Sequence, residues 1–453
     1  MREAHLSNEQ RERAYRSEFF HHALGKLLLS CGPMDPRGRR TVAFLSIVFL
    51  AGLGAWIYQL TKGLCVTAMG DYFSWGIYIA DFVFFIGISM AGTLISAILR
   101  LSGANWRSPI TRLAEVITVC ALLVAAPMII IDMGRPDRVL FTILYGRAQS
   151  PIIWDVLSLT TYLTGSLLYL YLPLIPDIAL LRDAGDRFPP WVRKLYGVLA
   201  LGWSGNEFQR KALERGIAIM AIAIIPVAIS IHTVTAWLFG LTLRPGWHST
   251  IIGPDFVVGA IYSGTAAVIS LMAIFRFVFR LGRYLDTSHF RKLGSLLLIS
   301  GLAYLYFYGN ELIGGVYTKE TADLRLLTSI FSGGFAWEFW STVGVGLLLP
   351  IFILAVPKFR SVTGIFIASL LVNAGMWLKR FLIVVPTLAS PFMPISGSPG
   401  AHLTYHPTWV EWTITAGAFA AFGLLFILFS RFFPVISIWE LTEEHAAGET
   451  PHA

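Results

Sequence analysis

Apolar stretches of about twenty residues recur along the whole chain, separated by short polar segments. A stretch of this length spans the ~30 Å hydrocarbon core of a bilayer as one α-helix. Ten such stretches predict ten transmembrane helices, at about residues 41–60, 75–99, 113–133, 153–175, 216–238, 256–279, 293–317, 339–356, 362–385 and 410–433. The pattern therefore predicts an all-α polytopic membrane protein.

Composition narrows the class further. Of 453 residues, 55% are hydrophobic and only 14% are charged, against roughly 25% charged residues in an average soluble protein. An ordinary cytosolic enzyme is therefore excluded. The net charge of +8 does not indicate a nucleic-acid partner, because no soluble segment is long enough to carry a basic binding face. We expect no nucleic acid among the partners.

Cysteine and histidine usage argues against metal centres in this chain. The three cysteines are widely scattered and form neither a CxxC pair nor a CxxCH motif, so a disulfide framework, an Fe–S cluster and a c-type haem are not expected. His232 is the only histidine well inside a predicted span, whereas a transmembrane b-haem usually takes two buried histidines. We predict no haem, Fe–S or other metal ligands here.

The distribution of Lys and Arg predicts the orientation. Alternate loops and the termini hold 26 of these residues on one side and seven on the other. By the positive-inside rule, both termini are predicted to be cytoplasmic, in a bacterial inner membrane. The long connection at 387–408 then faces the periplasm without Lys or Arg, which suits covering by a partner. Residues 6–29 are expected to form either an amphipathic helix on the membrane lipid or a solvated arm.

An internal repeat suggests how the helices are grouped. Asp81-Phe82-Val83 in the second helix and Asp255-Phe256-Val257 in the sixth both precede a small-residue segment and end in an Arg. Two matches four helices apart predict a duplicated four-helix unit, with chance similarity as the alternative. The expected divisions are a cytoplasmic arm (1–40), helix one and a periplasmic loop (41–74), a first bundle of helices 2–5 (75–240), a second bundle of helices 6–9 (241–386), a periplasmic loop and helix ten (387–433), and a cytoplasmic tail (434–453).

Ionisable residues inside the spans are unevenly distributed. A charge in the hydrocarbon region costs a few kcal/mol or more, so each invites a functional interpretation. Most fall near the predicted periplasmic ends, namely Asp81, Asp132, Asp155, His232, Asp255, Glu311, Lys379 and Arg380. The inner half offers mainly Glu115 and Arg276. Lys379 and Arg380 could either extend outward or pair with Glu311 and Asp255.

The acids near the periplasmic ends predict a quinone site in the first bundle. A buried acid beside an aromatic ring can hydrogen-bond a quinone carbonyl and exchange a proton with it. Asp132 and Asp155 flank one periplasmic connection and are the predicted proton-exchanging groups. The predicted quinone-binding neighbours are Tyr78, Asp81, Arg135, Trp154 and His232, and the candidates for a proton path are Glu115, Arg276, Glu311 and Arg380. The alternative for any one acid is a structural cap or interface anchor.

Four stretches of the chain resemble a known family. They are WGIYIADFVFFIGISMAGTLISAILR at 75–100, DMGRPDR at 132–138, a segment beginning SPIIWD at 150–183 and PGWHSTIIGPDFVVGAIYSG at 245–264. Together they resemble the NrfD-like (polysulfide reductase type) membrane subunits, especially the ten-helix branch of alternative complex III. The chain is also similar to the membrane subunits of menaquinone reductase complexes, and the parent complex stays open between these two.

The resemblance implies two four-helix bundles with flanking helices, no cofactor in the chain, and menaquinone or ubiquinone bound near the periplasm. It also implies a periplasmic Fe–S subunit, with multihaem cytochrome, molybdopterin-type or second NrfD-like subunits as further partners. In the alternative complex III branch, quinone-site residues include a His before the GRP motif and the Asp of SPxxWD. The second matches Asp155, whereas Asp132 stands at the first position and Met90 where a further His is expected.

Two other functions are compatible with ten spans. A secondary transporter also uses repeats and intramembrane charges, but transporters tend to hold substrate near the midplane, whereas the polar groups here gather near one face. A purely structural membrane anchor is the second alternative. Co-purification of redox subunits would favour the respiratory function over both.

Overall fold

The computed structural model describes residues 34–104, 106–183, 188–278, 282, 285–392 and 404–440. Within these residues, ten helical segments are long and apolar enough to cross a membrane, which confirms the predicted polytopic all-α fold. They are α2 (Pro36–Lys62), α3 (Ile77–Leu101), α4 (Ser108–Met133), α6 (Pro151–Asp183), α8 (Glu207–Gly240), α9 (Ile252–Val278), α10 (Thr287–Thr318), the composite Ala336–Ala355, α14 (Val362–Leu388) and α15 (Trp409–Phe432). The expectation for residues 6–29 lies outside the described residues.

The eighth span is a composite of three segments. It consists of α12 (Ala336–Ser341), a π-helical stretch η4 (Thr342–Leu348) and α13 (Leu349–Ala355). Gly346 of η4 meets Gly375 of α14 so closely that a Cβ built on Gly346 would lie 2.5 Å from the Cα of Gly375. Small residues let helix backbones approach in lipid, where apolar side chains gain little by leaving the hydrocarbon. The two glycines therefore set the distance between these helices.

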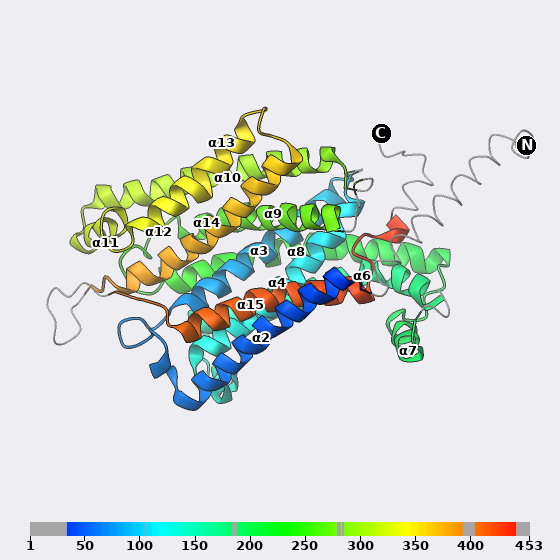
Figure 1. The fold of residues 1–453 in the computed structure, drawn as a ribbon, viewed down its shortest axis with the longest axis horizontal. Coiled ribbons are helices and arrows are strands. Elements are labelled where there is room, and N and C mark those ends of the chain that lie inside the picture. The colour runs from blue at the N-terminus through cyan, green and yellow to red at the C-terminus, as the bar shows by residue number, and fades with distance from the viewer. Residues whose placement is uncertain are drawn as a thin grey trace, which may run out of the picture.

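Three short helices were not predicted: α5 (Val139–Leu144), α7 (Pro190–Leu199) and α11 (Thr321–Phe331). Each lies in a connection between spans and is much shorter than a bilayer crossing, so a search for apolar stretches of about twenty residues passes over it. α11 lies at one end of the molecule and α7 at the other (Figure 1). We call the end where α4, α8 and α10 finish the predicted periplasmic face.

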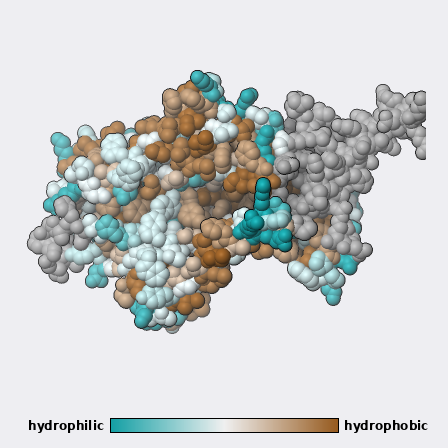
Figure 2. Space-filling model, in the orientation of Figure 1, coloured by the Kyte–Doolittle hydropathy of each residue, from teal (hydrophilic) through white to brown (hydrophobic). Residues whose placement is uncertain are grey.

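The long helices lie side by side around a central α3 (Figure 1). α3 packs against α4, α8, α9 and α14. Of the 18 most apolar consecutive residues in each helix, 89% are buried in α3 and 11% in α2. α6 packs along α8, α9 packs against α10 and α14, and α2 pairs with α15, which also contacts α4. Apolar side chains cover much of the middle of the face seen in Figure 2. The division into two bundles and the domain boundaries stay predictions.

Candidate functional site

Asp132 lies in the last turn of α4, at the predicted periplasmic face. The helix ends at Gly134, which has a left-handed φ of 67°. A Cβ at Gly134 would lie 2.7 Å from Cγ of Leu64, so both the backbone angle and the space require glycine. Asp132 itself is only 8% exposed. Its Oδ1 atom is buried and has no hydrogen-bond partner among the described residues.

The first and second spans bring polar groups to Asp132. Gln59 of α2 is buried, and its Nε2 donates to the carbonyl oxygen of Ile131 at 3.0 Å. The Tyr78 hydroxyl of α3 donates to Oε1 of Gln59 at 2.7 Å. The indole Nε1 of Trp56, one turn before Gln59, is buried without a hydrogen-bond partner in the described part of the chain. Near this end of α4 there are therefore two buried polar atoms with unsatisfied hydrogen bonds among the described residues, the donor Nε1 of Trp56 and the acceptor Oδ1 of Asp132.

An apolar groove of about 540 Å³ runs between α2, α4 and α15. Its wall extends from Met34 and Arg431, near the beginning of α2 and the end of α15, to Trp56 and Ile131 near the predicted periplasmic face. From Pro36, where α2 begins, to Trp56 the helix advances by 20 residues, which correspond to about 30 Å. Ile131 directly precedes Asp132, so one end of the groove opens beside the polar cluster. The groove can hold a long apolar chain whose polar head lies near Asp132.

Asp155 lies on the next long helix but faces a different neighbour. Oδ1 of Asp155 accepts a hydrogen bond from Oγ1 of Thr235 in α8 at 2.6 Å, and the carboxyl group is 4% exposed. His232 lies three residues before Thr235; its Nδ1 is 3.0 Å from the carbonyl oxygen of Ala228. Nε2 of His232 is buried and has no hydrogen-bond partner among the residues described. Asp155 of α6 and His232 of α8 are thus two further buried titratable groups within the predicted first bundle, the first held by Thr235 and the second by a carbonyl of its own helix.

A second cavity, of about 300 Å³, lies above Asp155 at the predicted periplasmic face. Pro151 and Ile152 at the start of α6 form one wall, and Trp75 and Trp247 form another. The two indole rings stack with their centroids 5.8 Å apart. Arg244 also lines this cavity. The groove reaches Ile131, next to Asp132, and the cavity reaches Ile152, three residues before Asp155, so the two acids lie near two separate spaces without lining either one.

The remaining predicted quinone-binding residues have other partners. Asp81 accepts hydrogen bonds from Nε1 of Trp377 and Oγ1 of Thr415, both at 2.7 Å, and so joins α3 to α14 and α15. Nε1 of Trp154 donates to the carbonyl oxygen of Ala148 at 2.6 Å and anchors the start of α6. These hydrogen bonds suit structural bracing.

Arg135 belongs to the exposed connection after α4. Its guanidinium binds the carboxylate of Asp137 through two hydrogen bonds of 3.0 Å, and both side chains are 60% exposed. This hydrogen bonding lowers the pKa of Asp137 from its usual value. Arg135 is therefore placed on the surface, where a partner can reach it, and not inside the groove.

The tenth span contributes a buried acid that the sequence did not reveal. Glu411 of α15 is fully buried and accepts hydrogen bonds from the backbone N–H groups of Ala68 and Thr408, each at 2.8 Å. The hydroxyl of Tyr405 also donates to it, and burial raises the pKa of Tyr405 well above its usual range. The Thr408-x-x-Glu411 spacing signals a capping box, but not the contact with the connection after α2.

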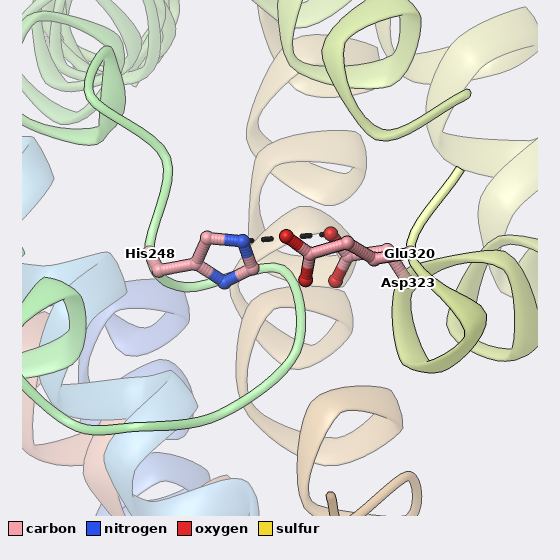
Figure 3. Close-up of side chains that lie close together, drawn as sticks. All are labelled: His248, Glu320 and Asp323. Carbon is pink, nitrogen blue, oxygen red and sulfur yellow. Dashed lines mark ion pairs between the residues drawn. The ribbon is translucent and has the colours of Figure 1, made fainter. Parts of the chain in front are cut away.

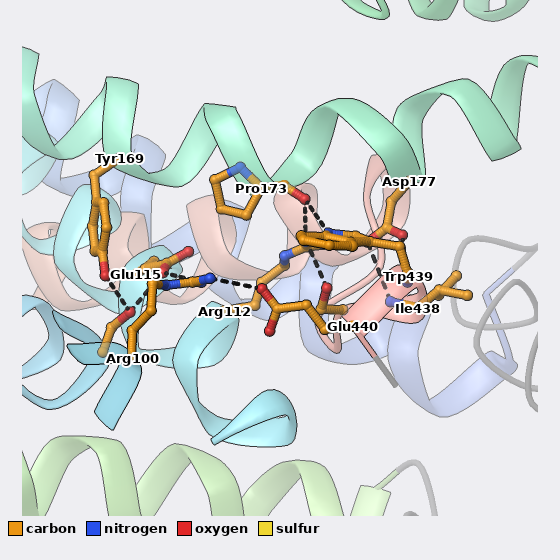
Figure 4. A network of polar contacts seen from close by, with 11 residues as sticks. Arg100, Arg112, Glu115, Tyr169, Pro173, Asp177, Ile438, Trp439 and Glu440 are labelled. Atoms are coloured by element: carbon orange, nitrogen blue, oxygen red, sulfur yellow. Dashed lines mark hydrogen bonds and ion pairs between the residues drawn. The ribbon is translucent and has the colours of Figure 1, made fainter. Parts of the chain in front are cut away.

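The inner half of the first bundle holds more buried charge than the sequence predicted (Figure 4). Arg100 of α3 pairs with Glu440 at 2.9 Å and with Glu115 at 3.5 Å. Arg112 of α4 pairs with Asp177 of α6, and both are at most 1% exposed. The sequence alone assigns Arg100 and Arg112 to the loop between the spans. The segment after α15 instead docks there and completes both networks.

The second bundle has its own polar cluster at the predicted periplasmic face. Nζ of Lys379 is 3.0 Å from Oε2 of Glu311 and 3.7 Å from the centre of the Tyr308 ring. Lys379 therefore pairs inside the protein, which settles one of the two alternatives for this residue. Arg380 lies over the ring of Phe256, 5.0 Å from its centre.

Arg276, the remaining candidate for a proton path, lies at the other end of α9. It donates a hydrogen bond to the carbonyl oxygen of Leu285, at the connection to α10. Its guanidinium also lies 5.8 Å from the centre of the Phe290 ring. These contacts fix the connection between two spans.

Comparison with known proteins yields one family and several relatives. The family model for "Polysulphide reductase, NrfD" matches residues 65–391. A putative membrane subunit of dimethyl sulfoxide reductase from Halobacterium salinarum is 29% identical over 88% of this chain and 92% of its own length. The Hdr-like menaquinol oxidoreductase integral membrane subunit of Archaeoglobus fulgidus is 23% identical over 88% and 96%. The integral membrane subunit of menaquinone reductase from Nitratidesulfovibrio vulgaris is 24% identical over 87% and 91%.

Proposed function

This chain is a member of the NrfD family, as its motifs predicted, and we propose that it is the quinone-binding membrane subunit of a multi-subunit respiratory oxidoreductase. Two similar proteins are named for menaquinol or menaquinone chemistry, and all three belong to oxidoreductases by name. The observation that carries the proposal is the unpartnered buried carboxylate oxygen of Asp132 at the end of an apolar groove. A bacterial inner membrane is the proposed location.

The groove matches the shape of a membrane quinone. Such a molecule has a small polar head with two carbonyl oxygens and a long isoprenoid tail. The volume of about 540 Å³ and the apolar wall suit the tail. The groove is lined by three membrane-spanning helices, so a quinone would enter it from the bilayer.

At the head of the groove, Asp132 would exchange a proton with one quinone oxygen. A carboxyl group can donate to the carbonyl of the quinone or accept from the hydroxyl of the quinol. The indole of Trp56 supplies a further unfilled donor. Tyr78 and Gln59 hold each other and the end of α4, which orients Asp132. The quinone itself supplies the redox chemistry.

Asp155 and His232 would serve as the second proton-exchanging pair. Thr235 holds Oδ1 of Asp155, and the free Nε2 of His232 lies in the same helix as Thr235. The cavity lined by Trp75 and Trp247 also contains Ile152, three residues before Asp155, and would give Asp155 a route to the predicted periplasmic face. Protons released at this face need not cross the membrane.

Electrons would pass to or from an Fe–S subunit docked on the predicted periplasmic face. Exposed Arg135 and Asp137 and the short helix α5 offer a docking surface beside Asp132. Multihaem cytochrome, molybdopterin-type or second NrfD-like subunits would complete the complex. The names of the relatives, which describe them as membrane subunits, support a multi-subunit assembly.

Substituting Asp132 by Asn tests the assignment. The amide keeps the shape of the side chain but cannot exchange a proton, so quinol turnover should fall by about 10²–10⁴-fold. The protein is purified with its co-isolated subunits, and oxidation of a soluble naphthoquinol is followed by absorbance. Asp183→Asn is the matched control, because its carboxylate is 64% exposed at the end of α6, away from the groove and from the proposed docking surface.

The outcomes separate the competing functions. Undiminished turnover in the Asp132→Asn protein contradicts the role of Asp132. Loss of quinol turnover in Asp155→Asn but not in Asp132→Asn would indicate that the quinone head binds in the cavity lined by Trp75. A chain that purifies alone and extracts no quinone would instead favour transport or anchoring.

A second activity, proton translocation, is favoured by a chain of buried polar groups in the first bundle. Thr93 and Tyr162 lie 2.8 Å apart, and one turn farther along α3, Ser96 donates to Glu115 at 2.6 Å. Tyr169 lies 3.1 Å from Ser96. The pairs of Arg100 with Glu115 and Glu440 then extend the chain toward the predicted cytoplasmic face (Figure 4). We propose this chain as an inner half-path for protons.

Glu115→Gln should separate the two activities. Electron transfer to quinone should continue, whereas acidification or alkalinisation of proteoliposomes during turnover should be lost. Equal proton movement in the wild-type and Glu115→Gln proteins would exclude Glu115 from the path. Glu207→Gln, at an exposed acid near the start of α8, is the control.

A further inference from the structure

Three metal-ligating side chains meet at the predicted periplasmic face, away from the groove beside Asp132 (Figure 3). His248 lies in the connection between α8 and α9, whereas Glu320 and Asp323 lie at the start of α11. One ligand atom from each residue lies within 4.8 Å of the others. Figure 3 shows the imidazole approaching from one side and the two carboxylates from the other.

Backbone groups hold two of these ligands in place. Nδ1 of His248 lies 3.4 Å from the carbonyl oxygen of Arg244. When Nδ1 carries the proton, the lone pair of Nε2 faces the carboxylates, as in histidines that bind metals. Oδ1 of Asp323 accepts from the N–H of Gly246 at 3.1 Å, and Oδ2 lies 3.5 Å from Nε2 of His248. Each side chain is therefore oriented by one atom and leaves the other toward the centre.

Negative charge gathers around this point without an equal number of cations. His248 and Asp323 line a cavity of about 310 Å³ together with Asp255, which is 4% exposed. Oδ1 of Asp255 is buried and has no hydrogen-bond partner in the described part of the chain. Lys379, which lines the cavity, pairs with Glu311, and the buried Arg380 interacts electrostatically with Asp255. Of the acids gathered here, Glu320 and Asp323 are therefore the carboxylates that have no Lys or Arg partner among the described residues. A bound cation would compensate the remaining carboxylates.

We propose that His248, Glu320 and Asp323 bind a divalent transition-metal cation, for which Zn²⁺ is the best match. Zn²⁺ takes imidazole nitrogen and carboxylate oxygen at about 2.0–2.2 Å, which separates tetrahedral ligand atoms by roughly 3.3 Å. The His248–Asp323 separation of 3.5 Å is close to this distance. Ca²⁺ and Mg²⁺ prefer oxygen ligands alone. Glu320 is exposed and can rotate inward, and water would complete the coordination.

The cation would tie α11 to the connection between α8 and α9. Trp247 directly precedes His248, donates from Nε1 to the carbonyl oxygen of Ile383 at 2.7 Å and stacks on Trp75. The same connection therefore forms a wall of the cavity above Asp155. Binding of the cation would hold this wall and the start of α11 in one arrangement.

Zinc retention by the purified full-length protein tests the proposal. The protein is stripped with EDTA, desalted, mixed with ZnCl₂ and passed through a gel-filtration column, and bound zinc is measured by mass spectrometry. Wild-type protein should retain one equivalent, and His248→Ala and Asp323→Asn should lose it. His406→Ala is the matched control, because this histidine lies outside the cluster. If the other variants fold poorly, Glu320→Gln replaces them, because this side chain is exposed; the Glu320→Gln protein should then retain less zinc than the wild type.

Several results would overturn the proposal. Equal zinc in the wild-type and His248→Ala proteins would exclude the imidazole as a ligand. No retained zinc in the wild-type protein would leave only an ion pair between protonated His248 and Asp323. Retention of Ca²⁺ but not of Zn²⁺ would indicate a carboxylate site without nitrogen. Quinone turnover is not measured in this assay, so its outcome is independent of the function proposed above.

Discussion

Replacing Arg112 by Met should strongly destabilise the first bundle. Arg112 and Asp177 are buried and paired, with side chains at most 1% exposed. Nη2 of Arg112 also donates to the carbonyl oxygen of Pro173 at 2.6 Å and to Ser437 at 3.2 Å. Removing one partner of a buried ion pair costs about 3–5 kcal/mol, because the other charge stays buried without compensation. We expect a loss of about 4 kcal/mol in the free energy of unfolding.

A double substitution distinguishes this cause from a general packing defect. Arg112→Met with Asp177→Leu removes both charges, and apolar replacement of a whole buried pair is often neutral. Asp177 also accepts from the backbone N–H groups of Ile438 and Trp439, at 3.3 and 3.1 Å. Replacing Asp177 leaves these two N–H groups without their acceptor oxygens, which should cost about 1 kcal/mol for each group. The double variant should therefore be about 2 kcal/mol less stable than the wild type, and more stable than Arg112→Met alone.

The assay is reversible unfolding in mixed detergent and SDS, followed by tryptophan fluorescence. Arg182→Met is the control, since Arg182 pairs with a 64% exposed Asp183 and such pairs are worth about 0–1 kcal/mol. A loss below about 1 kcal/mol in Arg112→Met would refute the reasoning. So would a double variant less stable than the single one.

Two further substitutions test the packing around α3 and α14. Asp81→Asn keeps one acceptor oxygen but turns an NH₂ group toward one of the two donors, Trp377 and Thr415, so we expect about 1–3 kcal/mol of destabilisation. Quinone affinity should not change. Weaker quinone binding by a stable variant would indicate a direct role for Asp81. Gly346→Ala places a Cβ 2.5 Å from Gly375, which should cost about 1–3 kcal/mol in thermal or SDS unfolding. Gly344→Ala, whose Cβ meets nothing within 4 Å, should have little effect, and equal effects of the two alanines would contradict the close contact.

The spans were predictable because bilayer thickness imposes one length on every crossing helix. The same length criterion missed α7 and α11, which are 10 and 11 residues long. The eighth span was located correctly, but its π-helical stretch at Thr342–Leu348 was not. A change in backbone hydrogen-bond register leaves hydrophobicity unaltered, so the apolar pattern carries no trace of it.

The candidate site was only partly predictable for a related reason. Asp132 and Asp155 stood out because an acid near the end of a span is conspicuous in sequence. Gln59 did not, because an uncharged amide is inconspicuous there, and Glu411 was passed over although it lies at the start of the predicted tenth span; both are at most 1% exposed in the structure. Gln59 reaches the carbonyl oxygen of a residue 72 positions away. No local spacing encodes a contact of that separation.

The sequence by itself determined the family, the ten crossings and the depth of each ionisable group along them, because hydrophobic length fixes where a helix lies along the membrane normal. Tertiary structure alone decided which side of each helix meets which neighbour. In lipid, this choice depends on close contact of small residues and on satisfied buried polar groups. Asp81 thereby acquired two donors, whereas an oxygen of Asp132 was left without one, among the described residues, at the end of the groove between α2, α4 and α15.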